Sequence, residues 1–194
     1  MEFRDPIHGF IHFNELEAEI INSPAFQRLR RIKQLALTDY VYPAASHSRF
    51  EHSLGVMHLA SRIFDSLVED KRSVEILRSE FGIREDSLPR FKQIVRLAAL
   101  LHDIGHTPYS HGGEDLLPPD EDGKPIKHEA YSTSIIRTAL ADLIDNHKEC
   151  TSHGIDAKTS YRRILVTDGV RRQRFTPSCR HQLPRIAPRK QSQA

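Results

Sequence analysis

A cluster of ionisable side chains between Leu101 and His111 is the part of this sequence best suited to chemistry. His102 is followed directly by Asp103, and further histidines follow within the next eight residues. An imidazole nitrogen beside a carboxylate oxygen is a donor pair for divalent Mn, Fe, Co, Ni or Zn, and suits Mg less well. Imidazoles also exchange protons near neutral pH. The cluster therefore predicts a metal site with proton-transferring groups beside it.

A further ligand must come from another helix, and His52 is the natural candidate because it lies in a second polar cluster. Each residue also has a plain structural interpretation, with His102 and Asp103 as a surface pair at a helix end and His52 as a solvated histidine. His106 and His111 beside the pair favour the metal interpretation, and Gly105 allows the backbone to approach a ligand closely.

Predicted helices position these residues. Apolar side chains recur with the helical period near 15–22, 50–69, 94–101 and 129–146. The segment 94–101 is apolar on nearly every side and predicts a buried central helix that is ended by Gly105 and Pro108. A shorter helix is predicted around 74–81, in the charged segment 70–90 that connects two of these helices. Residues 5–10 predict a turn or short hairpin. We predict an all-α fold, with residues 1–150 forming the helical core.

Periodicity also predicts which side chains are buried. Ser23 and Pro24 predict the start of another short helix, with Ser23 as its N-cap. The buried side chains of this helix are expected to be Phe26, Leu29, Ile32 and Leu35. Those of the long helix are expected to be Leu54, Met57, Ile63, Phe64 and Leu67, and those of 129–146 to be Ile135, Ile136, Leu140, Leu143 and Ile144.

Composition excludes several classes of protein. The chain has 194 residues, 38% of them hydrophobic and 28% charged, which is typical of a folded domain. No apolar run has the length of a membrane helix, and the first residues do not form a signal peptide. Two cysteines are too few for a disulfide framework. We therefore expect a soluble, cytoplasmic protein with no membrane partner.

Charge divides the chain into two parts. Residues 161–194 hold nine Lys or Arg and one acid, Asp168, whereas residues 1–160 carry net negative charge. From about residue 151 to residue 194 we predict a basic, poorly structured tail. A nucleic-acid contact through this tail is an alternative to a simply solvated segment.

Five blocks of the chain resemble the HD-domain metal-dependent phosphohydrolases, and within them the deoxynucleoside-triphosphate triphosphohydrolase branch, which is similar to SAM-and-HD-domain proteins. The resemblance covers about residues 3–135. The blocks are DPIHG at 5–9, PAFQRLR with IKQL at 24–35, SRFEHSLGV at 48–56, LLHDIGH with PYSH at 100–111, and KHE at 127–129. The resemblance implies an HD-domain helical bundle, a divalent metal ion, a homo-oligomer, and hydrolysis of a dNTP to a deoxynucleoside and triphosphate.

The resemblance also implies a role for individual residues. The metal ligands would be His52, His102 and Asp103. Histidines that contact phosphates or transfer protons would be His106, His111 and His128, with Glu114 as an orienting carboxylate. Arg49 would contact the substrate phosphates, and Gln34 would recognise the deoxyribose.

The family pattern stops before the tail. Its fourth ligand is an aspartate in a later block resembling DRxDYLLRD, and the sequence has no such block. Asp168 is the aspartate nearest to the expected place, while Asp142 and Asp145 are interpreted as solvated. We expect a truncated or frameshifted gene product after about residue 160. The alternative to an enzyme is a non-catalytic nucleotide-binding or interaction module, or an inactive fragment.

A regulatory nucleotide site is a further expectation. Family members bind an activating guanine nucleotide near the second helix, and Gln27 and Arg30 match that site. Asn22 stands where the family has an aspartate, and an amide cannot accept both guanine N–H groups as a carboxylate does. We therefore predict that guanine-specific activation is lost. The alternative is that Gln27 and Arg30 form a solvated helix face.

Overall fold

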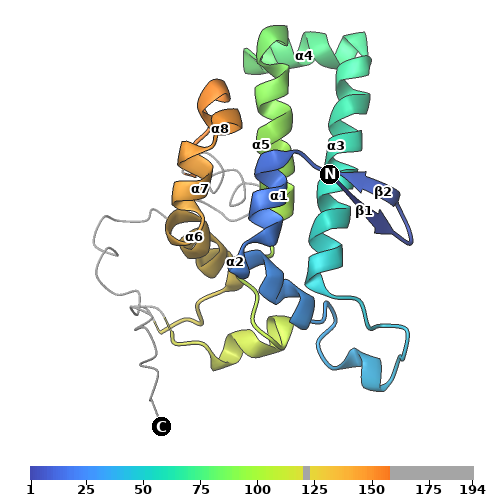
Figure 1. The fold of residues 1–194 in the computed structure, drawn as a ribbon, viewed down its shortest axis with the longest axis vertical. Coiled ribbons are helices and arrows are strands. Elements are labelled where there is room, and N and C mark those ends of the chain that lie inside the picture. The colour runs from blue at the N-terminus through green and yellow to red at the C-terminus, as the bar shows by residue number, and fades with distance from the viewer. Residues whose placement is uncertain (120–122, 158–194) are drawn as a thin grey trace.

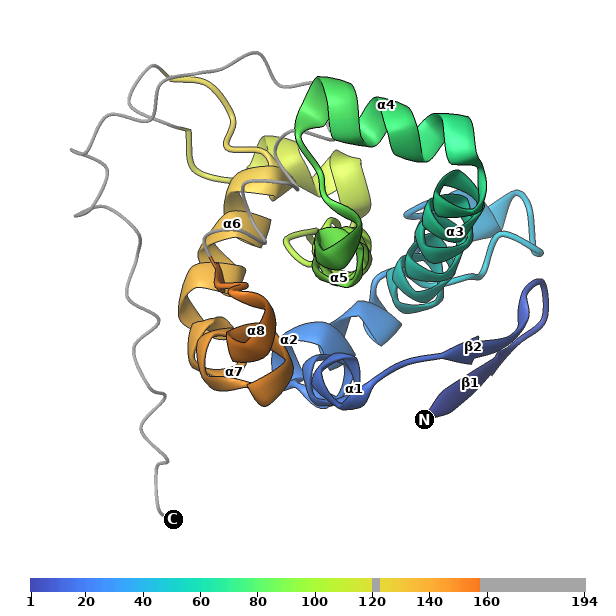
Figure 2. The same ribbon diagram turned by 90° about the horizontal axis from the view of Figure 1, so that it is seen from above.

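The computed structural model describes residues 1–119 and 123–157 of the chain. Helices α3 (Arg49–Glu69) and α5 (Leu88–Leu101) lie side by side, and α4 (Lys71–Phe81) crosses between their ends (Figure 1). Viewed from above, α5 lies at the centre, with α1, α3, α6, α7 and α8 around it (Figure 2). The predicted all-α fold is confirmed, and so is the predicted central helix.

The first residues form a two-stranded antiparallel hairpin, β1 (Glu2–Asp5) and β2 (Gly9–His12), in which Phe3 lies opposite Ile11. The predicted turn is therefore confirmed. The Asp5 carboxylate accepts hydrogen bonds from the backbone N–H groups of Ile7 and His8, each at 2.8 Å. These bonds stabilise the turn, and Ile11 is buried against the helices.

After α1 (Glu15–Asn22) comes a short helix, α2 (Pro24–Gln27), followed by the 3₁₀ turn η1 (Arg28–Arg31). Ser23 caps α2 as predicted, because its Oγ accepts the N–H of Phe26 at 3.3 Å. The expected stripe is partly wrong, since Leu35 is 47% exposed. The chain becomes extended at Ile32, whose carbonyl accepts the N–H of Arg49 at 2.8 Å, so the helical period that predicts a buried Leu35 ends before it.

Helix α3 matches its predicted length, but its predicted buried face is wrong in the second half. Leu54 and Met57 are buried, whereas Ile63 and Leu67 are 58% and 46% exposed. Periodicity finds the apolar face of a helix without showing how far a neighbour covers it. Here the end of α3 extends beyond the core toward α4 (Figure 1), which is longer than the predicted 74–81.

The predicted helix 129–146 is two helices, α6 (His128–Thr138) and α7 (Ala141–Asn146). The chain turns at Leu140, which is 1% exposed, and α7 then packs against α1. Ile136, Leu140 and Ile144 are buried as predicted. Helix α8 (Lys148–His153) follows, and the core continues to Ala157. The predicted tail lies mainly outside the described residues.

Short 3₁₀ segments complete the described fold: η2 (Thr38–Tyr40), η3 (Glu85–Ser87) and η4 (Ser110–Leu116). One contiguous core joins the hairpin and the helices, and its largest fully buried side chains include Phe26, Phe50, Leu97, Leu100 and Leu101. Across the described residues, none of the helices combines the length and apolar character needed to span a membrane.

A buried charge pair fixes α5 within the bundle. Glu17 of α1 is fully buried and accepts two hydrogen bonds from Arg96 of α5, at 2.7 and 2.6 Å. Arg96 also donates to the carbonyl of His12, at 2.9 Å. Gln93 donates to Glu17 and accepts from Asn14, the N-cap of α1. The hairpin, α1 and the middle of α5 are thereby tied together.

Candidate active site

The chain leaves α5 at His102, and the local hydrogen bonding orients this imidazole. Its Nδ1 lies 2.7 Å from the carbonyl of Ala99, one turn earlier. Because a carbonyl can only accept, Nδ1 carries the proton and Nε2 keeps its lone pair. Nε2 lies 3.3 Å from Oδ1 of Asp103. A backbone carbonyl that fixes the tautomer in this way is typical of histidines that ligate metals.

His52 reaches the same carboxylate from the first turn of α3. Its Nε2 lies 3.5 Å from Oδ2 of Asp103, and its ring centroid is 5.3 Å from that of His102. Within this group, the possible ligand atoms of the three side chains all lie within 4.8 Å of one another. Two imidazoles and a carboxylate fit a divalent transition metal. The structure thus brings together the three predicted ligands, although His52 and Asp103 are 51 residues apart in the sequence.

Electrostatics keep Asp103 ionised. Burial favours its neutral form, but a hydrogen bond from His106 and the positive charge of Arg49 outweigh burial and hold the pKa of Asp103 well below its usual value. Arg49 forms an ion pair with this carboxylate, and both side chains are nearly inaccessible to solvent. Burial also lowers the pKa of His52. Deprotonated donors at neutral pH are the forms that bind a metal.

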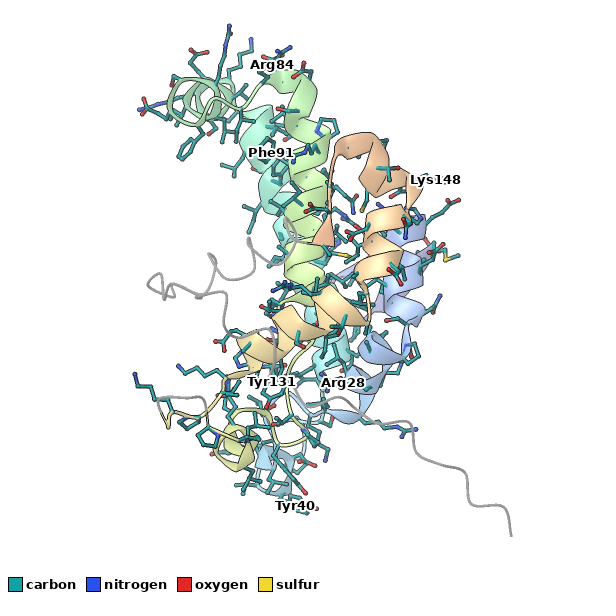
Figure 3. The ribbon with its side chains drawn as sticks, turned by 90° about the vertical axis from the view of Figure 1, so that its left-hand side faces the viewer. Arg28, Tyr40, Arg84, Phe91, Tyr131 and Lys148 are labelled. Atoms are coloured by element: carbon teal, nitrogen blue, oxygen red, sulfur yellow. The ribbon has the colours of Figure 1, made fainter. Side chains whose placement is uncertain are left out.

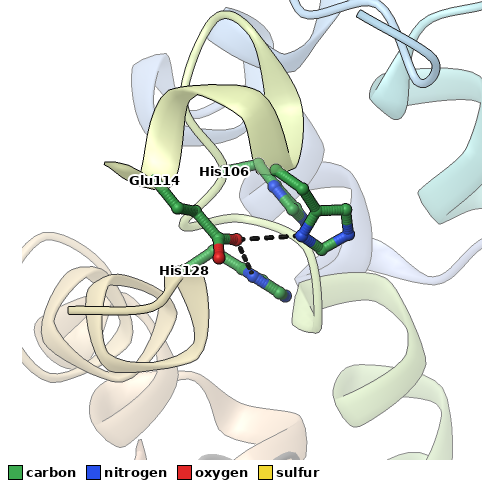
Figure 4. Close-up of side chains that lie close together, drawn as sticks. His106, Glu114 and His128 are labelled. Carbon is green, nitrogen blue, oxygen red and sulfur yellow. Dashed lines mark hydrogen bonds and ion pairs between the residues drawn. The ribbon is translucent and has the colours of Figure 1, made fainter. Parts of the chain in front are cut away.

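A second cluster adjoins the first through His106, whose Nε2 lies 3.4 Å from Oδ1 of Asp103. The His106 ring stacks on that of His128, with centroids 3.7 Å apart. Glu114 accepts hydrogen bonds at a single oxygen from His128, at 2.6 Å, and from His111, at 3.0 Å (Figure 4). The structure therefore brings together the four residues predicted for phosphate contact and proton transfer.

The imidazoles of this cluster differ in their access to solvent. The His106 side chain is 1% exposed, and burial lowers its pKa to about 4. The His111 side chain is 69% exposed. Burial favours protonation of Glu114, but the hydrogen bonds from His128 and His111 dominate and lower its pKa. Glu114 can therefore stay ionised and hold both rings with Nδ1 protonated, so that each Nε2 is free to act.

Backbone packing places the loop that carries the site. A Cβ on Gly105 would lie 2.1 Å from the carbonyl oxygen of His128, so only glycine lets α6 approach this closely. Ser132 of α6 accepts the N–H of Gly105 at 2.8 Å and donates to the carbonyl of His102 at 3.0 Å. From η1, Arg28 donates to the carbonyls of Ile104 and His106 in the same loop.

The predicted phosphate-binding residue Arg49 is buried beneath the site. Besides Asp103, it donates from Nε to the Oγ of Ser110, at 3.0 Å. Ser110 donates in turn to the carbonyls of Lys33 and Gln34. The side-chain oxygen of Gln34 is buried and has no protein partner among the described residues. Gln34 and Arg49 are thus neighbours through Ser110, as a shared role in binding one substrate requires.

Sequence reasoning missed Arg28, Ser110 and Ser132. A serine within a helix and an arginine beside other arginines carry no local signal, because their partners are 76 to 78 residues away for Arg28 and 27 to 30 residues away for Ser132. Ser110 has a positive φ of 52°, which is uncommon outside glycine, but this backbone feature is visible only in the structure. Asp168, the predicted fourth ligand, lies outside the described residues.

The residues predicted for a regulatory nucleotide lie around the end of α1 and the start of η1. Gln27 donates to the carbonyl of Ile21 and accepts from Arg30, each within 2.8 Å. The Arg30 guanidinium lies over the Phe50 ring, 3.6 Å from its centroid. Asn22 is exposed. Gln27 and Arg30 are therefore a bonded pair, and their role as a nucleotide site stays a prediction.

The fold and the site together define an α-helical protein whose central helix ends in an adjacent His–Asp pair, with a third donor from a second helix. A family model described as "HD domain" matches residues 49–165, more than half of the chain. The chain belongs to the HD-domain family.

Individual relatives agree with this assignment. The chain is 45% identical over 131 residues to deoxynucleoside triphosphate triphosphohydrolase SAMHD1 of Mus musculus. This match covers 67% of this chain and 18% of that protein. It is 46% identical over 108 residues to an uncharacterized protein of Methanocaldococcus jannaschii, covering 56% of this chain and 19% of that protein. The chain thus spans about a fifth of the length of these relatives.

Among solved structures, a hypothetical protein from Aquifex aeolicus superposes with a TM-score of 0.60 and 36% sequence identity. The match covers 87% of this chain and 37% of that one. The helical arrangement is therefore shared with a solved structure over most of the chain.

Proposed function

We propose that this chain carries part of the catalytic domain of a metal-dependent phosphohydrolase that cleaves a deoxynucleoside triphosphate into a deoxynucleoside and triphosphate. The observation that carries the proposal is the convergence of His52, His102 and Asp103 beside a separate, carboxylate-oriented cluster of histidines. The substrate class is supported by the similarity to relatives named deoxynucleoside triphosphate triphosphohydrolases. Hydrolysis of a phosphate ester needs both charge neutralisation and proton transfer, and the two clusters divide these tasks.

The first cluster is suited to the phosphate. A divalent ion held by His52, His102 and Asp103 would neutralise phosphate charge and lower the pKa of a water molecule. Arg49 holds Asp103 in place, and its contacts with protein use Nε and Nη1. Its remaining N–H groups are therefore available to a phosphate oxygen, where a guanidinium stabilises developing negative charge.

The second cluster is suited to the leaving group. Departure of the deoxynucleoside requires a proton on its sugar oxygen, and the imidazolium form of a histidine is an efficient donor near neutral pH. His111 is the exposed imidazole of the cluster, and Glu114 holds its Nδ1. We assign the proton donor to His111, because the other two rings are at least nine-tenths buried and stacked on each other. His128 and His106 then line the phosphate side.

The test is a product analysis. The purified chain is mixed with each of the four dNTPs and Mn²⁺, Co²⁺, Fe²⁺ or Mg²⁺, and products are resolved by ion-exchange chromatography. The proposal predicts triphosphate and deoxynucleoside in equal amounts, with no product when EDTA replaces the metal. Release of inorganic phosphate with a nucleoside diphosphate would contradict the proposed bond, and the absence of product with every dNTP would contradict the activity.

A further inference from the structure

Arg28 lies outside both ligand clusters, yet it contacts the loop that carries them. It is the first residue of η1, the turn that follows α2 (Figure 3). Its guanidinium donates from Nη1 to the carbonyl of His106 at 2.8 Å, and from Nη2 to the carbonyl of Ile104. These two carbonyls stand on either side of Gly105. Ile104 follows Asp103 directly, and His106 carries a buried ring of the second cluster.

The partners of this arginine are unusual for a charged group. Arg28 is partly buried, and burial lowers its pKa. Both acceptors that the structure gives it are neutral carbonyls rather than carboxylates. Burying a guanidinium without neutralising its charge costs free energy, so a purely space-filling role would be served better by an apolar side chain. The position of the Arg28 guanidinium must therefore matter to the two carbonyl groups that it binds.

The loop is held from two sides at successive backbone groups. Ser132 of α6 bonds the carbonyl of His102 and the N–H of Gly105. Arg28 bonds the carbonyls of the residues before and after that glycine. Glycine is the residue with the greatest conformational freedom, so a loop centred on one needs external contacts to keep a single geometry. The direction of the His106 ring depends on that geometry.

We propose that Arg28 is a positioning residue that sets the orientation of the His106 imidazole and, through the adjoining backbone, the geometry of Asp103 as a metal ligand. This inference rests on the proposed function. The planar guanidinium suits the task because its fork spans two carbonyls at fixed spacing, which a lysine ammonium cannot do. Groups one step removed from a metal ligand typically change metal affinity or activity by about 10- to 100-fold when altered.

The chain offers a matched control in Arg90. This arginine also donates to two neighbouring carbonyls, those of His153 and Gly154, at 2.7 and 3.3 Å. Arg90 lies near the start of α5, whereas Arg28 contacts the loop that follows the end of α5. Arg28→Lys and Arg90→Lys therefore make the same chemical change to the same kind of contact, and only the first touches the site. Arg28→Gln, which keeps a planar donor, serves as a second variant if Arg28→Lys does not fold.

The experiment reads the imidazoles directly. Long-range ¹H–¹⁵N spectra of the metal-free full chain report the tautomer and environment of each histidine ring. We expect Arg28→Lys to shift the ring nitrogens of His106 and to leave those of His8 and His58 in place, while Arg90→Lys shifts none of them. Identical His106 resonances in wild type and in folded Arg28 variants would overturn the proposal.

Binding of Co²⁺, followed by its visible absorption, provides the second measurement. Arg28→Lys is expected to weaken Co²⁺ binding by about tenfold or more and to change the absorption bands, with Arg90→Lys unchanged. Equal binding by both variants would overturn the proposed effect on Asp103 and leave the metal site intact. If the wild type binds no Co²⁺, the proposed function fails, while the ring-nitrogen comparison still decides whether Arg28 orients His106.

Discussion

The middle of α5 and the loop that follows its end each lie beside a buried carboxylate, but the two carboxylates are paired differently. In the middle of α5, Glu17 and Arg96 meet at 2.6 and 2.7 Å, and both Glu17 oxygens have protein partners. After the end of α5, Asp103 pairs with Arg49, and the imidazoles of His52, His102 and His106 surround it at 3.3 to 3.5 Å, which is too long for strong hydrogen bonds. The Nδ1 atom of His106 is buried without a partner among the described residues.

This difference separates a structural network from a functional one. A buried network in which every group is paired stabilises one conformation. A buried network with unpaired lone pairs costs stability, and proteins keep such groups where a ligand or a reaction uses them. The middle of α5 therefore anchors the helix, and the loop after its end presents donors. The following changes test this comparison from the largest expected effect to the smallest.

Asp103→Asn should cause the largest loss of activity. The amide is similar in shape but lacks the charge that holds a divalent ion, so we expect dNTP hydrolysis to fall on the order of 10⁴-fold, or about 5 kcal/mol of transition-state stabilisation. Asp65→Asn is the control, because Asp65 forms a partly exposed pair with Lys92. Activity of Asp103→Asn within tenfold of the wild type would show that this end of α5 is not the reaction centre.

Glu17→Gln should affect stability rather than chemistry. It leaves Arg96 buried with no full charge opposite, and such changes cost about 3–5 kcal/mol. Urea denaturation measures this loss in the free energy of unfolding. Glu15→Gln on the same helix removes an exposed pair with Lys148 and should change the midpoint little. Equal midpoints for the two variants would mean that the buried network does not anchor α5.

Gly105→Ala should disturb the loop that follows α5, since the new Cβ would meet backbone atoms of His128 and Ser132 that cannot rotate away. Overpacking of this kind typically costs about 1–3 kcal/mol, and occasionally more. Gly112→Ala is the control because its Cβ would meet open space. Thermal melting compares the two, and similar melting temperatures would contradict the close approach of α6 to the site loop.

Acid should weaken the fold through His106. Its pKa is lowered to about 4 by burial, so between pH 6.5 and 4 the unfolded chain takes up a proton that the folded ring excludes. Stability should therefore fall as the pH falls from 6.5 to 5, by about 2 kcal/mol more in the wild type than in His106→Asn. Asp103, whose pKa is lowered, loses its stabilising effect only below this window. Parallel pH profiles for the two proteins would refute buried, neutral His106.

Much of the fold could be predicted from the sequence because it depends on local signals. The Ser23 cap, the hairpin turn at Asp5 and the apolar run of α5 each occupy a few consecutive residues. The exposure of Ile63 and Leu67 could not be predicted, since it depends on how far the other helices extend along α3. The turn that splits 129–146 likewise follows from packing at Leu140 rather than from glycine or proline.

The sequence predicts the candidate ligand side chains of the site, but not the side chains that hold them in position. His102, Asp103 and His106 are adjacent in the chain, so their residue types reveal the chemistry. The buried pairing of Arg49 with Asp103 was not foreseen, because it joins residues 54 apart in the sequence. The same holds for Arg28 and Ser132, whose side chains orient backbone rather than contact a ligand atom. Such supports are visible only when distant elements are placed together.

The most direct test is the metal content of the protein. Within the part of the chain that the structure describes, His8 and His58, whose ring centroids are 5.2 Å apart, provide a control pair for His52 and His102, whose centroids are 5.3 Å apart. Elemental analysis after loading with Mn²⁺ and gel filtration should give one ion per chain in the wild type and in the His8→Ala/His58→Ala double variant. It should give none in His52→Ala/His102→Ala. Metal lost equally from both double variants, or retained in both, would contradict a metal centre at the end of α5.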